Sequence, residues 1–171
     1  MKNLFLKRNV IFFAVIIFMG AVCIPLMHGQ NSNTEVQFVQ KLSDVLENGN
    51  IDQALALFEK IPAELSEDVD MMCLKGSLLL SAGKTKEAGE VASVLYSKEP
   101  KNVDVLALNV MVCKQKGDKA NKTKFIRQIT AIQPNNPEAN IELADEQALK
   151  KNWRNARDYY KKALTGDPDN E

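Results

Sequence analysis

The sequence predicts an all-α protein, an α-solenoid stack of four helical hairpins that follows an N-terminal apolar helix. Glycines recur at one fixed interval, at Gly49, Gly83 and Gly117. Prolines recur at the same interval, at Pro100, Pro134 and Pro168. Before each glycine, apolar residues follow the spacing of one helical face. A fixed period of this length is typical of repeated units that each bury an apolar face against a neighbour.

Residues 1–29 are expected to lie outside the stack, as a signal peptide or an N-terminal membrane anchor. Lys2, Lys7 and Arg8 form a basic start, and residues 10–27 carry no charge. As a helix, this uncharged run would be about 27 Å long, which is close to the thickness of a bilayer core. The basic start places the rest of the chain outside the cytoplasm, in a bacterial periplasm.

Cleavage of this segment and its retention as an anchor both stay open. Possible cleavage sites at Cys23 and Gly29 match the usual small-residue pattern only in part. A lipid attached to Cys23 is disfavoured, because Val22 is branched where a small residue is needed. Residues 30–34 are expected to form a linker to the stack.

Each hairpin is expected to contain a first helix, a turn with the glycine, a second helix and a proline. Glycine adopts the left-handed conformation that closes a helix, and proline disfavours helix at the residue before it. Lys151 takes the glycine position of the fourth hairpin. The predicted domain covers residues 35–171, with units at about 35–68, 69–102, 103–136 and 137–170.

The second helices are expected to cross the first ones closely through a small residue, with a larger residue one turn later. The predicted packing residues, together with the prolines, are Ala54, Phe58, Ala88, Ile126, Ala156, Tyr160, Pro100, Pro134 and Pro168. Lys122 takes the small position of the third unit, so its stem must extend outwards or that hairpin packs loosely. Pro62 is expected to end the second helix of the first unit early.

This pattern resembles the tetratricopeptide repeat, in which an alanine, an aromatic residue four positions later and a proline recur with a period of about 34 residues. Ala54 with Phe58 and Ala156 with Tyr160 match it, and the resemblance covers about residues 35 to 170. The first half of the pattern is degenerate, and Gly76 alone keeps its glycine. The resemblance implies a right-handed superhelix and a non-catalytic scaffold or adaptor that binds proteins.

The resemblance also implies a concave groove lined by the first helices. Its candidate residues are Val39, Ser43, Cys73, Ser77, Ala107, Met111, Lys114, Ile141 and Asp145. The lysine and asparagine with which some family members clamp a terminal carboxylate are missing from the middle positions. We therefore expect a mildly apolar groove that accepts an extended or helical peptide segment. The alternative is that these residues partly pack against one another.

Composition argues against other classes of function. Without its basic start the chain carries slightly more acidic than basic groups, so it has no general attraction for nucleic acid. The single histidine, His28, lies beside the apolar segment, and no catalytic motif is present. We expect no enzyme activity, cofactor or metal. Glu142, Asp145 and Glu146 share a helical face that is interpreted as solvated rather than as a site.

Three further features of the sequence each allow two interpretations. The basic run from Lys114 to Arg127 is expected to face the acidic helix of the next unit or solvent, with an anionic ligand as the alternative. Cys73 and Cys113 are interpreted as buried small residues rather than a disulfide, since the implied helix arrangement offsets them by about 9 Å.

The third feature is the last helix, which carries Tyr159, Tyr160, Ala163 and Leu164. Repeat arrays usually close with a polar-faced capping unit, and the fourth unit has no such face. We therefore hypothesise that this end associates with a partner or with a second copy. The alternative function is a subunit of an envelope complex, anchored in the membrane through residues 10–27.

Overall fold

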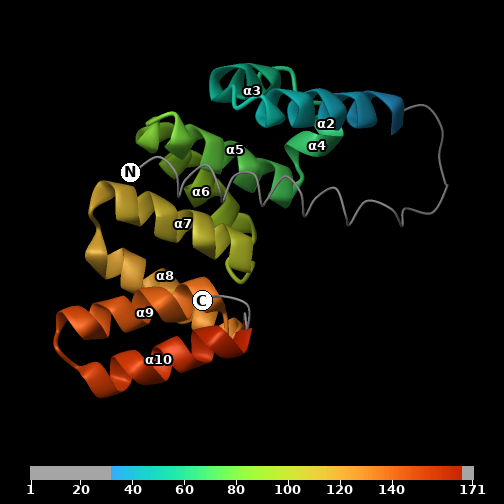
Figure 1. The fold of residues 1–171 in the computed structure, drawn as a ribbon. Coiled ribbons are helices and arrows are strands. Elements are labelled where there is room, and N and C mark those ends of the chain that lie inside the picture. Colours follow the sequence, from blue (N-terminus) through green and yellow to red (C-terminus); the bar gives the residue numbers. More distant parts are fainter. Residues whose placement is uncertain (1–31, 167–171) are drawn as a thin grey trace. The chain divides into compact units, whose positions relative to one another are not determined.

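The structure, a computed structural model, describes residues 32–166, and in this range it is all-helical, as predicted. Its helices are α2 (Ser32–Glu47), α3 (Ile51–Phe58), α4 (Ala63–Ser66), α5 (Val69–Ser81), α6 (Thr85–Lys98), α7 (Val103–Lys116), α8 (Lys119–Ile132), α9 (Pro137–Leu149) and α10 (Trp153–Gly166) (Figure 1). The chain divides into two compact units, each larger than one hairpin, one up to Val91 and one from Ala92. From here on, the first unit and the second unit mean these two parts of the chain. The boundary between them falls inside α6.

The turns at the glycine positions share one backbone conformation. Gly49, Gly83 and Gly117 have φ angles of 69°, 77° and 74°, and Lys151 has 59°. The Gly83 N–H donates to the Leu80 carbonyl, the next N–H donates to the carbonyl of residue 79, and the other three turns repeat both bonds. This Schellman arrangement satisfies carbonyls that a helix end leaves unpaired. The predicted role of the glycines is confirmed, and Lys151 fills it in the fourth turn.

The turns between hairpins also repeat, through a side chain that caps the next helix. Asp68, Asn102 and Asn136 recur at the interval of the glycines and are the N-caps of α5, α7 and α9. Asp68 Oδ1 accepts a hydrogen bond from the Met71 N–H at 2.8 Å, and the two asparagines accept equivalent bonds. These caps satisfy N–H groups that a helix start leaves unpaired.

The prolines lie where second helices have ended. α6 ends before Pro100 and α8 ends before Pro134, while Pro168 lies outside the described residues. Pro100 and Pro134 are exposed, so they act on the backbone and not as packing residues. Pro62 interrupts the first hairpin as predicted, because α3 ends at Phe58. The chain then continues as the single turn α4, for which Pro62 is the N-cap.

The N-terminal boundary differs from the prediction. α2 begins at Ser32, inside the range 30–34 that the sequence assigns to a linker. Glu35 lies in its first turn, where a negative charge favours a helix N-terminus, so the helix extends further than the repeat pattern requires. The predicted signal or anchor, residues 1–29, lies outside the described residues. Within 32–166, no helix combines the length and apolar character needed to cross a membrane.

The first unit is built around the contact between α2, α3 and α5. The rings of Phe38 and Phe58 meet edge to face, with centroids 5.8 Å apart. Ala54 is fully buried and lets the helices approach closely. From α5, Met71, Leu74 and Leu78 complete the cluster. The aromatic residue of the repeat therefore contacts both its own hairpin and the helix that follows.

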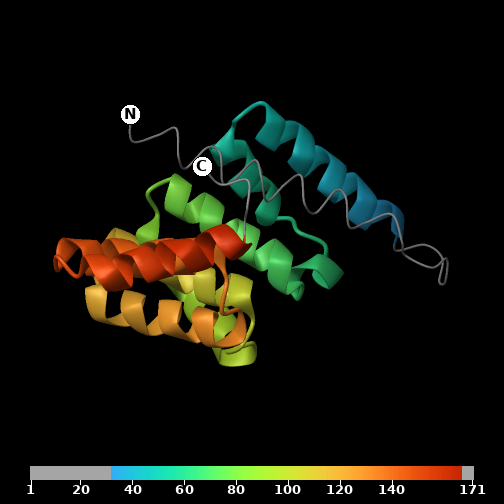
Figure 2. The same cartoon turned by 60° about the horizontal axis from the view of Figure 1, so that its bottom comes forward.

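The second unit contains α7 to α10, and Figures 1 and 2 show α9 and α10 side by side. Its apolar cluster joins Leu106 of α7 and Ile126 of α8 to Leu143 of α9. Two buried asparagines lie among these helices. Asn109 Nδ2 donates to the carbonyls of Ala92 and Val105. Asn140 Nδ2 donates to the carbonyls of residues 134 and 136, so it holds the turn before its own helix.

Among the predicted packing residues of the second helices, Tyr160 is the one whose side chain is exposed. Those residues are all buried: Ala54, Phe58, Ala88, Ile126 and Ala156. Tyr160 is not a packing residue, because its side chain is 39% exposed and its neighbour Tyr159 packs against the core instead. Ala163 is also buried, so the exposed face of α10 is narrower than the sequence pattern indicates.

Candidate functional site

The groove candidates of the first unit are largely taken up by packing. Cys73 is 4% exposed, and Val39 packs against the core cluster of that unit. Ser43 and Ser77 are half-buried, and the Ser77 carbonyl accepts a hydrogen bond from the Ser81 hydroxyl. Of these four predicted residues, Cys73 alone is fully buried, and the other three keep part of their surface.

The groove candidates of the second unit fall into two groups. Ala107 packs against the core, and Met111 and Ile141 are half-buried. Lys114 and Asp145 are exposed, but each contacts another side chain. These two residues belong to a polar cluster. The sequence predicts its basic run and its acidic helix but not which side chains pair.

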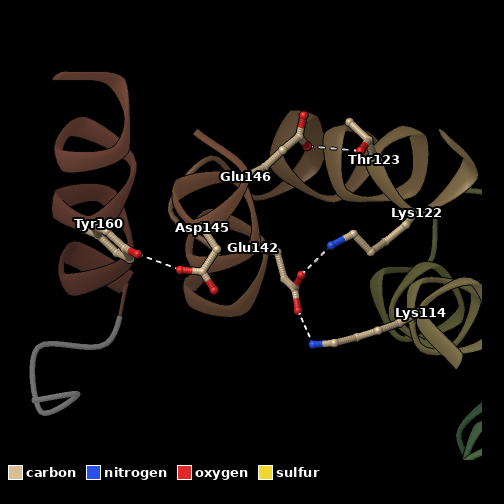
Figure 3. Close-up of polar contacts among 7 residues, drawn as sticks. All are labelled: Lys114, Lys122, Thr123, Glu142, Asp145, Glu146 and Tyr160. Atoms are coloured by element: carbon tan, nitrogen blue, oxygen red, sulfur yellow. Dashed lines mark hydrogen bonds and ion pairs between the residues drawn. The ribbon is translucent and has the colours of Figure 1, made fainter. Parts of the chain in front are cut away.

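Glu142 of α9 is the centre of this cluster and lies between two lysines (Figure 3). Its Oε1 is 2.5 Å from Lys114 Nζ of α7, and its Oε2 is 2.8 Å from Lys122 Nζ of α8. Burial by itself would raise the pKa of Glu142, but the hydrogen bonds and charges of both lysines outweigh it and lower the pKa. Glu142 is therefore a carboxylate that joins three helices.

This contact explains the lysine at an alanine position. The Lys122 side chain is 21% exposed and reaches Glu142 on α9. Of the two predicted outcomes, a stem that extends outwards or a loosely packed hairpin, the structure has the first. The interpretation that the basic run faces the acidic helix is confirmed for Lys122 and Lys114. Lys114 is 65% exposed, so solvent screens its pair with Glu142 more strongly.

The other two carboxylates of α9 have partners of their own. Glu146 accepts hydrogen bonds from Thr123 of α8 and from Lys150, and the bond from Lys150 is the main cause of its lowered pKa. Asp145 points away from them and accepts a hydrogen bond from the Tyr160 hydroxyl at 2.6 Å (Figure 3). That bond raises the pKa of Tyr160, because it stabilises the protonated phenol.

This geometry favours structural roles for the acidic face over a metal or catalytic site. Glu142, Asp145 and Glu146 point to different neighbours and do not converge on one point (Figure 3). Across the described range 32–166, no group of three or more histidine, cysteine or acidic residues is placed to hold a metal ion. The lysines are engaged by Glu142, so this cluster is balanced in charge.

Cys73 and Cys113 are buried thiols and not a disulfide, as interpreted from the sequence. Burial is the main cause that raises the pKa of the Cys113 thiol, and nearby Asp118 acts in the same direction. A thiol with a raised pKa is protonated at neutral pH and is a poor nucleophile or metal ligand. Its role at this position is packing.

Exposed apolar residues gather on the last hairpin. Leu149, Trp153, Tyr160 and Leu164 are four of the large hydrophobic residues that the described chain exposes. Trp153 is 66% exposed at the start of α10, and Leu149 is the last residue of α9. The sequence pattern indicated Tyr160 and Leu164 but missed the other two. The available signal was the single tryptophan of the chain, at the first position of a second helix.

Comparison of the chain with models of known protein families gives no match, and comparison with curated proteins gives none either. The resemblance to the tetratricopeptide repeat therefore rests on the repeated residues and turns themselves.

Proposed function

We propose that this protein is a non-catalytic scaffold or adaptor built from four tetratricopeptide-like hairpins in a right-handed superhelical stack. The observation that carries the proposal is the repetition of both turns. The same positive-φ residue and the same backbone bonds recur at Gly49, Gly83, Gly117 and Lys151. Capping side chains recur at the same interval between hairpins. Such units bury their apolar faces mainly against neighbours, which gives an extended surface suited to protein partners.

The leading binding mode is a peptide segment in the groove of the first helices. Support comes from each unit by itself: the first has the small half-buried side chains of Ser43 and Ser77, and the second has the apolar half-buried side chains of Met111 and Ile141. Lys114 is engaged by Glu142, which argues against an anionic ligand at that position. A groove of this character favours an uncharged extended or helical peptide.

A second mode is association through the last hairpin, in a membrane-anchored envelope subunit or between two copies. The exposed side chains of Leu149, Trp153, Tyr160 and Leu164 favour it. Exposed apolar residues that gather on one element typically mark an interaction surface. In both modes we place the body of the protein outside the cytoplasm, on the strength of the basic and apolar residues 1–29. The mass of the mature N-terminus tests whether that segment is removed.

Crosslinking and capture from envelope fractions distinguishes the two modes when two variants are compared. Met111→Arg adds charge to the groove, and Trp153→Ala removes apolar surface from the last hairpin. If the groove binds, Met111→Arg should abolish capture of the partner while Trp153→Ala leaves it unchanged; the second mode predicts the reverse. Circular dichroism must first show that both variants keep the wild-type helix content. Equal capture by the wild type and both variants would refute both modes.

A further inference from the structure

One position of the repeat differs between the last hairpin and the others. Phe58, Ala92 and Ile126 occupy equivalent positions of successive hairpins and are 2%, 0% and 1% exposed. Tyr160 occupies the same position in the fourth hairpin and is 39% exposed. Its hydroxyl is held by Asp145, so the ring stands in a fixed orientation on the surface of α10.

Each of the three buried copies contacts the first helix of the following hairpin. Phe58 packs in a cluster with Met71 and Leu74 of α5. Ile126 packs with Ala139 and Leu143 of α9, and the Ala92 carbonyl accepts a hydrogen bond from α7. Within residues 32–166, no such helix packs over Tyr160, whose side chain stays 39% exposed. The face of α10 around Tyr160 thus has the position of a helix-accepting surface.

This face of α10 combines apolar residues with positive charge. Trp153, Tyr160 and Leu164 recur at helical spacing, so they lie along one side of the helix, and all three are exposed. Arg157 and Lys161 lie beside them on the same side and are also exposed. Arg157 contacts only its chain neighbour Asp158 among the ion pairs of the described residues, at 3.5 Å with both side chains exposed.

The repeat register shows which charge an incoming helix should carry. At the α8–α9 contact, Thr123 of the covered helix donates to Glu146 of the covering helix. Arg157 occupies the position of Thr123 in the last hairpin. A helix that covers α10 in the same way would place the equivalent of Glu146 opposite Arg157, where an acidic side chain forms an ion pair.

We propose that this face of α10 docks an amphipathic helix of a partner protein, apolar toward Tyr160 and acidic toward Arg157 and Lys161. The inference rests on the proposed repeat fold and specifies the partner of its second binding mode. The partner helix continues the repeat in trans and shields the apolar residues that α10 exposes. Its acidic residues select it among other apolar helices.

Charge and polarity disfavour three occupants that the chain itself can supply. Two copies joined face to face through α10 would bring Arg157 and Lys161 near like charges. α2 of a second copy presents exposed Gln40, Lys41 and Asp44 at the positions where α9 carries its covering residues, so that helix is too polar. The segment 1–29 contains basic residues and no acidic residue.

Trp153 makes a direct test possible, because it is the single tryptophan of the chain and lies on this face. The probe is a synthetic peptide of residues 136–152, the α9 segment that covers Ile126. Added to the full chain, it should shift Trp153 emission to shorter wavelength in a saturable way. A second peptide with Glu146→Lys, the position that faces Arg157 in this register, should bind about tenfold more weakly.

Charge reversal on the protein gives the matched control. The variant Arg157→Glu with Lys161→Glu should prefer the lysine peptide, whereas Lys84→Glu with Lys86→Glu, exposed in another hairpin, should keep the wild-type preference. Equal binding of both peptides, or no change in Trp153 emission, would overturn the proposal. So would a monomer in which acrylamide cannot quench Trp153, or a dimer in which Trp153 is shielded, since the chain itself would then cover this face.

Hydrogen exchange of the wild-type chain separates failure of the docking proposal from failure of the proposed fold. Protection that repeats at the interval of the four turns supports the array whether or not the peptide binds. Loss of that pattern would refute the array itself. Retained protection without a Trp153 response would refute the docking proposal alone.

Discussion

Lys151 is the one residue outside glycine that adopts positive φ in the described chain, and replacing it by glycine should stabilise the protein. A left-handed conformation costs a residue with a side chain about 1–2 kcal/mol. Glycine offsets part of this gain, because it loses about 0.5–1 kcal/mol more backbone freedom on folding. Lys151→Gly should therefore raise the free energy of unfolding by about 0.5–1 kcal/mol, or the melting temperature by about 2 °C.

Two further variants isolate the backbone effect. Gly117→Ala adds a Cβ to the equivalent left-handed turn, where it would meet no atom within 4 Å, so any loss must come from conformation. It should lower the free energy of unfolding by a similar amount, about 0.5–1 kcal/mol. Lys151→Ala keeps a Cβ in the left-handed turn and should change stability little, because Lys151 is exposed.

Urea unfolding followed by circular dichroism measures the three variants, and hydrogen exchange locates the effect in the turn between α9 and α10. Because the proposed array would unfold with strong local contributions, the change in exchange should be largest in the last hairpin. Equal shifts of the urea midpoint in Lys151→Gly and Lys151→Ala would refute the backbone explanation, because the loss of the lysine side chain would then account for the change in stability.

Three other predictions concern a close approach, a cap and an ion pair. Gly166→Ala should destabilise the chain by about 1–3 kcal/mol, since its Cβ would overlap the Asn135 carbonyl oxygen, whereas Thr165→Ala should have little effect in thermal melts. Asp68→Ala should cost about 1 kcal/mol in urea unfolding, and Asp68→Asn, which keeps an acceptor, should cost much less. Glu142→Gln should cost about 1 kcal/mol at neutral pH. Because the folded pKa of Glu142 is lowered, its stabilisation is present above the ordinary carboxyl pKa and is lost as pH falls through the lowered value. Unfolding curves of the wild type and Glu142→Gln should therefore converge in acid; a constant difference would contradict the assignment.

Much of the local structure could be predicted from the sequence, because it depends on residues with distinctive backbone behaviour. Gly49 and its equivalents close helices, and Pro62 ends α3, since the conformation each requires is a property of that residue. The capping role of Asn102 and Asn136 was missed, although they recur at the same interval, because their signal lies in a side-chain bond rather than in hydrophobic periodicity.

The arrangement of side chains on each surface was harder to predict. Tyr159 and Tyr160 differ by about 100° around a helix, and the alignment that predicts Tyr160 as the packing residue ignores what covers it. The sequence places Lys114 in a groove, but its side chain is long enough to reach Glu142 on another helix. Contacts of this kind depend on how two helices approach, which a single-chain pattern does not specify.

The buried amide of Asn109 has a consequence for how such a chain avoids misfolding. Similar hairpins can pair with the wrong neighbour, a characteristic failure of repeat proteins. Asn109 bonds the Ala92 carbonyl of the preceding second helix, whereas the equivalent positions carry Lys41, Lys75 and Leu143. A pairing that left no second-helix carbonyl beside Asn109 would remove one of the two hydrogen bonds of this amide, at a cost of about 1 kcal/mol, while the bond to the Val105 carbonyl of its own helix would remain. Asn109 thus ties α7 to the helix before it through a hydrogen bond that forms only when the two helices approach closely.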